Sequence, residues 1–272
     1  MDLTSFISTH QENLVVWCLT GGGHFFDENY KVFMKLLSNG QPILAIFSNA
    51  GAIVHNRYGF FWKLSELTSN NPQVLFLFEN EECLDNNIQF LLEKANISYS
   101  VLPDDSAFSR GIWIANQKIK CIVASPLTAN SVAKLTHGIA DTLIVNILSA
   151  GKKASQLIGV FPTDRGSDTI ISYLPVRQKK PLPMNIINIK VCTFGALKIT
   201  SSTYVEYSPE ICVGCQSCVK KYPDYFTVNE KIKVQIRKID QANSQKLASE
   251  FRLFQTPDEI FSFVSMLSQG TA

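Results

Sequence analysis

The chain has 272 residues, 46% of them hydrophobic and 18% charged, which indicates a globular protein rather than a disordered or fibrous one. Its 25 Lys and Arg against 23 Asp and Glu leave a net charge of +2, too small to indicate nucleic acid or an anionic membrane as a partner. The sequence shows neither a membrane-spanning run nor a signal peptide, so we expect a cytoplasmic location.

Short apolar runs rich in β-branched and aromatic residues alternate with longer helical segments between residues 14 and 162. Because these runs are apolar on both sides, they indicate a parallel sheet that crossover helices cover on both faces. The sequence therefore predicts an α/β fold with a doubly wound parallel sheet, similar to flavodoxin or Rossmann folds. The expected strands are residues 14–19, 43–47, 74–78, 98–101, 121–124 and 157–161.

Three helices can be placed from the sequence. The first starts at Phe26, from which apolar residues recur at helical spacing. The second is expected from residue 129 to about residue 150, with a break near Gly138. The third follows the N-cap residue Thr256, which precedes a proline at the first helical position.

The composition changes after residue 164. Residues 175–184 contain several prolines and basic side chains, which indicates an extended linker. The sequence therefore predicts a first domain over residues 1–174, which holds the sheet, and a C-terminal helical tail over residues 241–272. Between the linker and the tail, residues 185–240 are expected to form a small domain whose cysteine spacing resembles that of ferredoxin-like iron–sulfur domains.

Three of the seven cysteines, Cys212, Cys215 and Cys218, form a C-x2-C-x2-C run. On a turning loop each can reach a different iron of a cluster, whereas zinc is normally held by two separated pairs. Residues 192–197 resemble the tail of a degenerate ferredoxin run, which implies Cys192 as the fourth ligand of one 4Fe–4S cluster. The alternatives are a three-cysteine 3Fe–4S cluster, zinc, or no metal.

Two loops follow expected strands near the N-terminus. Residues 20–24 are rich in glycine and precede a helix, an arrangement in which the backbone can approach a phosphate. Phe26 stands where a dinucleotide fingerprint has Gly or Ala, so the loop favours a mononucleotide. Residues 48–51 follow the next strand. Either loop alone could also be an ordinary connecting turn.

A third loop, residues 125–131, resembles the Pro-Ala-Ser-Ala-Asn-Thr motif of the homo-oligomeric flavin-containing cysteine decarboxylase superfamily. The resemblance extends from residue 14 to about residue 164. It implies FMN, with the isoalloxazine at the third loop and the ribityl and phosphate groups at the other two. For Thr128 and Asn130 the alternative is helix capping. The cofactor-binding residues implied are Thr20, Gly21, Gly22, Gly23, His24, Ser48, Asn49, Ser125, Pro126, Leu127, Thr128, Ala129 and Asn130.

The added cysteine segment looks like that of the dihydromethanopterin reductase-like iron–sulfur flavoproteins within this superfamily. Residues 17–24 and 125–143 also look like that group. The resemblance implies an oxidoreductase that passes electrons from a ferredoxin-like donor through the 4Fe–4S cluster to FMN and on to a dihydropterin. His24 and His55 are the candidate catalytic proton donors, because imidazole titrates near neutrality. A flavin or packing contact is the alternative for both.

The remaining expectations concern partners. The resemblance implies a homo-oligomer built on trimers, and Phe60, Phe61, Trp62 and Trp113 are candidates for a pterin platform. A group of basic side chains near the cysteine run could dock an acidic electron donor or simply form a solvated face. The group comprises Lys220, Lys221, Lys231, Lys233, Arg237 and Lys238.

Two other functions stay open. One is an electron-transfer flavoprotein without a small substrate, and the other is a flavin-dependent decarboxylase or prenyltransferase relative.

Overall fold

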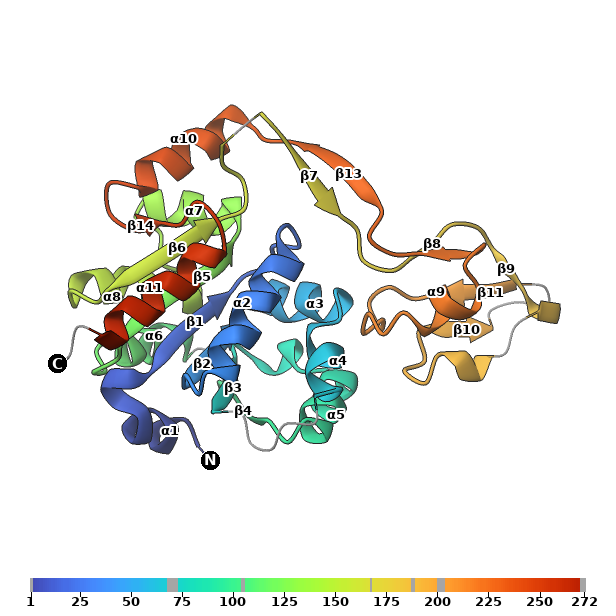
Figure 1. Cartoon of the computed structure of the whole chain (residues 1–272), viewed down its shortest axis with the longest axis horizontal. Helices are drawn as coiled ribbons and strands as arrows, with labels where there is room; N and C mark the ends of the chain where they lie inside the picture. The colour runs from blue at the N-terminus through green and yellow to red at the C-terminus, as the bar shows by residue number, and fades with distance from the viewer. Residues whose placement is uncertain are drawn as a thin grey trace.

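A computed structural model of the chain describes residues 2–67, 73–103, 106–166, 168–186, 189–199 and 204–269. Its largest unit is a seven-stranded parallel sheet in the order β14-β6-β5-β1-β2-β3-β4 (Figure 1). The doubly wound parallel sheet predicted from the sequence is confirmed. The strands are β1 (Val15–Leu19), β2 (Ile43–Phe47), β3 (Val74–Phe78), β4 (Ser98–Val101), β5 (Cys121–Leu127), β6 (Ile158–Pro162) and β14 (Arg252–Leu253).

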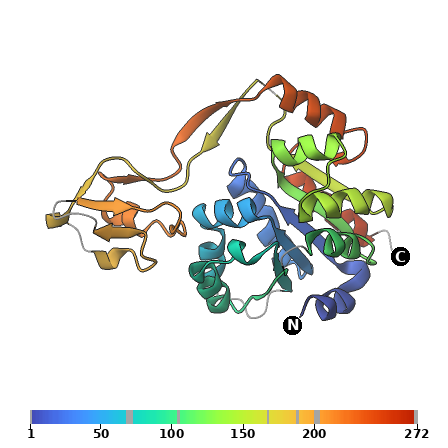
Figure 2. The ribbon, with the colours of Figure 1, turned by 180° about the vertical axis from the view of Figure 1, so that it is seen from behind.

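Helices cover both faces of this sheet, as Figure 1 and Figure 2 show from opposite sides. On one face lie α2 (Phe26–Ser38), α3 (Asn49–Arg57), α4 (Phe60–Ser65), α5 (Asn86–Lys94) and α11 (Asp258–Gln269). On the other lie α1 (Leu3–His10), α6 (Ala107–Ala115), α7 (Ala129–Thr136), α8 (Leu143–Lys153) and α10 (Lys238–Leu247). The expected break near Gly138 separates α7 from α8.

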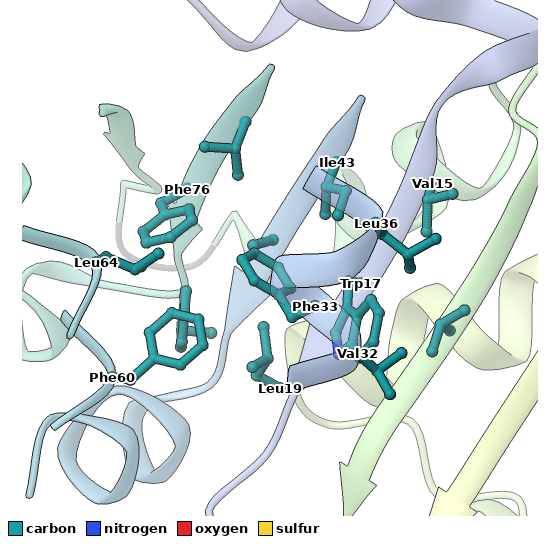
Figure 3. Packing of buried hydrophobic residues seen from close by; sticks show 14 of the residues in the cluster. Val15, Trp17, Leu19, Val32, Phe33, Leu36, Ile43, Phe60, Leu64 and Phe76 are labelled. Carbon is teal, nitrogen blue, oxygen red and sulfur yellow. The ribbon is translucent and has the colours of Figure 1, made fainter. Parts of the chain in front are cut away.

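Alternation along β1 shows how the strands serve two cores at once. Val15, Trp17 and Leu19 point into the core beneath α2, where Trp17 meets Phe33 edge-on with ring centroids 5.5 Å apart (Figure 3). Val16 and Cys18 pack into the core on the opposite face. Both cores are buried, which explains why the strands read as uninterrupted apolar runs.

A two-stranded arm leaves the main domain and carries a small lobe. The arm pairs β7 (Thr169–Tyr173) with β13 (Lys231–Gln235) in antiparallel fashion, and both views show it bridging the two units. We call residues 174–230 the lobe. Its elements are β8 (Arg177–Gln178), β9 (Leu182–Pro183), β10 (Leu197–Ile199), β11 (Tyr204–Tyr207), α9 (Ser217–Lys221) and β12 (Phe226–Thr227). The described residues also include short 3-10 helices at Gln11–Asn13, Glu81–Cys83, Met184–Ile186 and Ile189–Val191.

The chain returns to the main domain after the arm. Residues 241–272, expected as a helical tail, supply the end of α10, helix α11 and also β14, which pairs in parallel with β6 at the edge of the sheet. The C-terminal segment thus completes the sheet, and α11 packs on α2. Within the described ranges, the helices are too short or too polar to cross a membrane.

Candidate functional site

The three predicted loops meet at the edge of the sheet formed by the carboxyl ends of its strands, because they follow the adjacent central strands β5, β1 and β2. Thr20 joins the first loop to the third: its hydroxyl donates to the Pro126 carbonyl at 2.8 Å and accepts from the Thr128 amide at 2.9 Å. The Ser48 amide donates to the Leu19 carbonyl at 3.2 Å, which ties the second loop to β1. The loops therefore form one connected surface.

Two glycines permit this close approach. A Cβ on Gly51 would lie 2.2 Å from the Leu19 carbonyl oxygen, so a side chain there would push α3 away from β1. A Cβ on Gly22 would lie 2.8 Å from Thr163 Cγ2. Distances this short are incompatible with any larger residue unless the backbone moves. Glycine at both positions keeps the three loops in contact.

The third loop is divided between interior and surface. Ser125, Pro126 and Leu127 belong to β5 and are buried, and the Trp17 indole donates to the Ser125 carbonyl at 2.7 Å. Ala129 is half-buried and Asn130 is exposed at the start of α7. The Thr128 hydroxyl forms no capping bond to the helix backbone and instead lies 3.2 Å from the Ser131 hydroxyl. The surface of the loop therefore begins at Thr128.

Several polar atoms at this edge are buried without a hydrogen-bond partner among the described residues. They are both ring nitrogens of His24 and Asn49 Oδ1. Because buried polar groups are nearly always paired, such atoms point to a polar ligand. Burial lowers the pKa of His24, while the nearby Asp164 carboxylate opposes that shift. The donors, acceptors and glycine backbone present here fit a flavin mononucleotide.

Two carboxylates that sequence reasoning missed hold the second loop in place. Glu79, directly after β3, accepts from the Leu143 amide at 2.7 Å and from the Asn49 amide at 3.4 Å. Glu82 accepts from the Asn49 side-chain amide at 3.2 Å. A carboxylate at the first turn of a helix is stabilised by the helix dipole, and Glu79 serves α3 and α8 together. Its position after an apolar strand was the available signal.

His55 lies deeper than its predicted role requires. Its ring packs between Phe26, Phe47 and Phe60, with centroid distances of 5.7, 5.9 and 5.5 Å. Burial lowers its pKa to about 4, and the Thr20 backbone carbonyl opposes the shift only in part. The imidazole is therefore neutral near pH 7. Its catalytic role stays a prediction, and the geometry favours packing.

This buried imidazole makes stability depend on pH. The unfolded chain binds a proton on His55 below about pH 6.5, whereas the folded chain resists protonation down to about pH 4. Stability is therefore fully present above pH 6.5 and is lost as the pH falls toward 4, by up to about 3 kcal/mol. We expect His55→Phe to reduce this loss in urea titrations at pH 7.5 and 4.5. An unchanged pH dependence in the variant would contradict the assignment.

The four predicted ligand cysteines lie together in the lobe. Cys192, Cys212, Cys215 and Cys218 line one small cavity, along with Tyr207 and residues around them. Backbone amides point at two of the sulfurs: Ala196 N lies 3.3 Å from Cys192 Sγ, and Gly214 N lies 3.5 Å from Cys212 Sγ. Burial, followed by the neighbouring thiols, raises the pKa of Cys218 to about 12. The seven cysteines of the chain are free thiols in this structure.

No group of three or more His, Cys, Asp or Glu side chains in the described ranges is arranged around a single metal ion. One zinc ion would draw its sulfur ligands to about 2.3 Å from a common centre. A four-iron cluster instead takes each thiolate on a different iron, so its ligands surround a larger volume. The four cysteines share one small cavity, and backbone amides point at two of their sulfurs.

The cysteine loop is anchored directly on the main domain. Val213 is 1% exposed and belongs to the core beneath α2, although the lobe supplies it. A Cβ on Gly214 would lie 2.5 Å from Gly59 N and 2.7 Å from the Arg57 carbonyl oxygen, so the two backbones touch at the junction of α3 and α4. The lobe is thus held both by the arm and by this contact.

A larger cavity of about 290 Å³ lies where the glycine loop, the arm and the cysteine loop meet. Gly23 and His24 line it from the main domain, and Gly214 and Gln216 line it from the lobe. Gln216, in the left-handed conformation at φ 63°, also lines the cysteine cavity. Gln216 therefore lies between the cysteine cavity and a space that reaches the glycine loop.

The expected aromatic platform does not form. Phe60 and Phe61 are buried in the core beneath α2, where Trp62 on α4 meets Phe194 of the lobe edge-on. Trp113, on α6, packs against the core on the opposite face of the sheet. Most of the four rings serve as core, which was the alternative for them. The sheet separates Trp113 from the others.

The sequence matches the family profile described as Flavoprotein over residues 6–237. The chain belongs to the Flavoprotein family. This match confirms the family resemblance predicted from the loops. Relatives of the chain include proteins described as dihydromethanopterin reductase (acceptor). One from Methanocaldococcus jannaschii is 28% identical over 258 residues, covering 93% of this chain and 96% of its own. Another from Methanosarcina mazei is 24% identical over 241 residues, covering 86% and 91%.

Among solved structures, DmrB from Burkholderia xenovorans in complex with FMN shares the fold, with a TM-score of 0.51. It is 19% identical, and the match covers 95% of this chain and 97% of that one. That protein is described as a cubic protein cage for redox transfer. Because the match covers 95% of this Flavoprotein family member, it includes most of the arm and the lobe as well as the main domain.

Proposed function

We propose that this chain is an iron–sulfur flavoprotein oxidoreductase. Electrons would pass from a ferredoxin-like donor through one 4Fe–4S cluster to FMN and then to a dihydropterin. The observation that supports this most is the placement of four cysteines around one cavity, which Gln216 separates from a second cavity at the glycine loop. The names of the two archaeal relatives and the FMN complex of DmrB support the substrate and the flavin.

The proposed FMN site uses the edge where β5, β1 and β2 end. Backbone groups of residues 20–24 and the α3 start at Ser48 and Asn49 would hold the phosphate and ribityl groups, and Thr128, Ala129 and Asn130 would hold the ring. Bound FMN accepts single electrons and delivers two together as a hydride, which matches one-electron supply to a two-electron reduction.

The proposed cluster site uses Cys192, Cys212, Cys215 and Cys218. Deprotonating four neighbouring thiols, two of them buried, is unfavourable unless iron compensates their negative charge, as the raised pKa of Cys218 indicates. The Ala196 and Gly214 amides donate toward sulfur and would stabilise that charge further. The lobe core around Leu182, Val205 and Phe226 keeps the loop in shape.

Reduction of a pterin C=N bond adds a hydride to carbon and a proton to nitrogen. His24 is the better candidate for holding that proton, because it lines the larger cavity and its ring nitrogens lack partners in the described structure. His55 is enclosed by aromatic rings and neutral at physiological pH. We therefore assign the proton to His24 and packing to His55.

The proposed donor docks on the lobe side of the molecule. Lys220 and Lys221 end α9, which starts within the cysteine run, and Lys231 and Lys233 are exposed on the arm. Arg237 pairs with Asp240 at 2.7 Å and contributes less free charge. A homo-oligomer built on trimers is part of the proposal, supported by the cage described for DmrB.

Anaerobic purification tests the proposal, with assays of flavin, iron and sulfide and a visible spectrum. We expect one FMN and about four irons per chain, bleaching of both chromophores by a reduced ferredoxin at a rate that falls with salt, and reoxidation by a dihydropterin. If other redox proteins reoxidise the reduced protein and a dihydropterin does not, the protein is an electron-transfer flavoprotein without a small substrate. Iron-free protein that turns over a carboxylated substrate would instead indicate a decarboxylase relative.

A further inference from the structure

The larger cavity has a wall whose chemistry the proposed cofactors do not use. Besides the glycine loop, it is lined by the first turn of α2 with Asp27 and Glu28, and by the aromatic side chains Phe26, Tyr58 and Tyr173. The Tyr58 hydroxyl donates to the Tyr173 carbonyl at 2.7 Å, which closes the cavity between the main domain and the arm. Its volume of about 290 Å³ is at the lower end of small-molecule sites.

The two carboxylates on this wall differ in their surroundings. Asp27 forms an ion pair with Lys63 at 2.7 Å, and the Lys63 ammonium also lies 4.7 Å from the centre of the Phe26 ring. Glu28 is exposed and forms no ion pair or hydrogen bond with any residue that the structure describes. Its carboxylate is therefore available to a ligand without breaking an existing contact.

We propose that Glu28 is the specificity residue that binds the amino-pyrimidinone edge of the pterin in this cavity. That edge presents two parallel N–H donors, the ring N3–H and the 2-amino group, which match the two oxygens of a carboxylate. Tyr58 and Tyr173 would flank the ring system, and His24 lines the same cavity. This inference rests on the proposed function, because it assigns a place to the substrate of that reaction.

The remaining charges of the cavity agree with this orientation. Lys31 and Arg57 also line it, and neither is paired with Glu28 in the described structure. A neutral pterin would donate its ring N–H and amino group to the Glu28 carboxylate, and its carbonyl oxygen could then accept a hydrogen bond from a cation. An analogue with oxygen in place of the 2-amino group would instead bring two acceptors together, which is unfavourable.

Equilibrium binding to the oxidised holoprotein tests the assignment, with 6-methylpterin and 6-methyllumazine as probes that differ in the 2-amino group. We expect the wild type to bind the pterin about tenfold or more tightly than the lumazine, because a hydrogen bond to a charged group is lost and a repulsion added. Glu28→Gln should weaken pterin binding and remove or invert the preference, since an amide also donates. Glu12→Gln, at an exposed glutamate in the first 3-10 helix, is the matched control and should retain the preference.

The outcomes separate this inference from the proposed function. If Glu28→Gln retains flavin and iron but keeps the wild-type preference, the Glu28 assignment is wrong and the reductase proposal stands. If the wild type binds neither probe, the pterin as substrate and the assignment both fall. A pterin preference that disappears only in Glu28→Gln supports the assignment, because a general structural defect would weaken both probes alike.

Discussion

Cys215→Ser should reduce the iron and sulfide content about tenfold or more while the FMN content stays unchanged. A serine hydroxyl is a poor ligand for iron, and the loss of one thiolate leaves one iron of a cluster without its protein ligand. Cys215 is half-buried and its sulfur lies 3.5 Å from the Ser217 hydroxyl, so the smaller, more polar side chain fits without leaving a cavity in the core. The visible spectrum should then show flavin alone.

Cys83→Ser is the matched control. Its thiol is also close to a polar partner, with Sγ 3.0 Å from Asn80 Oδ1, but it lies after β3 in the main domain and outside the cysteine cavity. We expect this variant to retain iron, sulfide and flavin. Full iron and sulfide content in Cys215→Ser would exclude the cysteine cavity as the cluster site.

Gly214→Ala should loosen the lobe from the main domain. Its φ of 66° already disfavours a side chain, by about 1–2 kcal/mol, and the new Cβ would overlap Gly59 N and the Arg57 carbonyl oxygen. Two backbones cannot both keep their positions, so the cysteine loop must withdraw and take Val213 out of the core. Electron transfer between lobe and flavin should slow, because its rate depends on the distance between the two centres.

The test for Gly214→Ala is limited proteolysis of the arm together with stopped-flow measurement of flavin reduction. We expect faster cleavage near residues 169–173 and 231–235, with FMN content unchanged. Gly166→Ala controls for backbone strain alone, since its φ is 80° and an added Cβ would meet nothing within 4 Å. Equal effects from both variants would show that strain, rather than the contact with Gly59, is responsible.

The parallel sheet could be predicted from the sequence because its signal is local. Each central strand, such as β2, is apolar along its whole length, and turn or cap residues mark its ends. The short strands of the lobe, such as β8 and β12, carry only two residues each and lack any periodicity. β14 was missed for the same reason. Its pairing with β6 depends on where the chain returns in space.

The candidate site was predictable where the sequence has a motif and not where contacts join distant segments. The loops at Thr20, Ser48 and Thr128 follow strands and could be named from order alone. Glu79 lies 30 residues from Asn49 and 64 from Leu143, so no local pattern reveals that it holds both helices. The aromatic platform failed because the face on which Trp113 packs depends on the path of α6 around the sheet.

The arm also has a consequence for how the gene product is organised. The Ile236 amide donates to the Asp168 carbonyl at 2.9 Å, so the chain departs from and re-enters the main domain at neighbouring points. The arm and the lobe, between Asp168 and Ile236, are therefore an insertion whose two ends lie side by side, and not a domain added at one end of the chain. A short turn could bridge those ends, so the arm and the lobe could be removed or exchanged without altering the connectivity of the sheet.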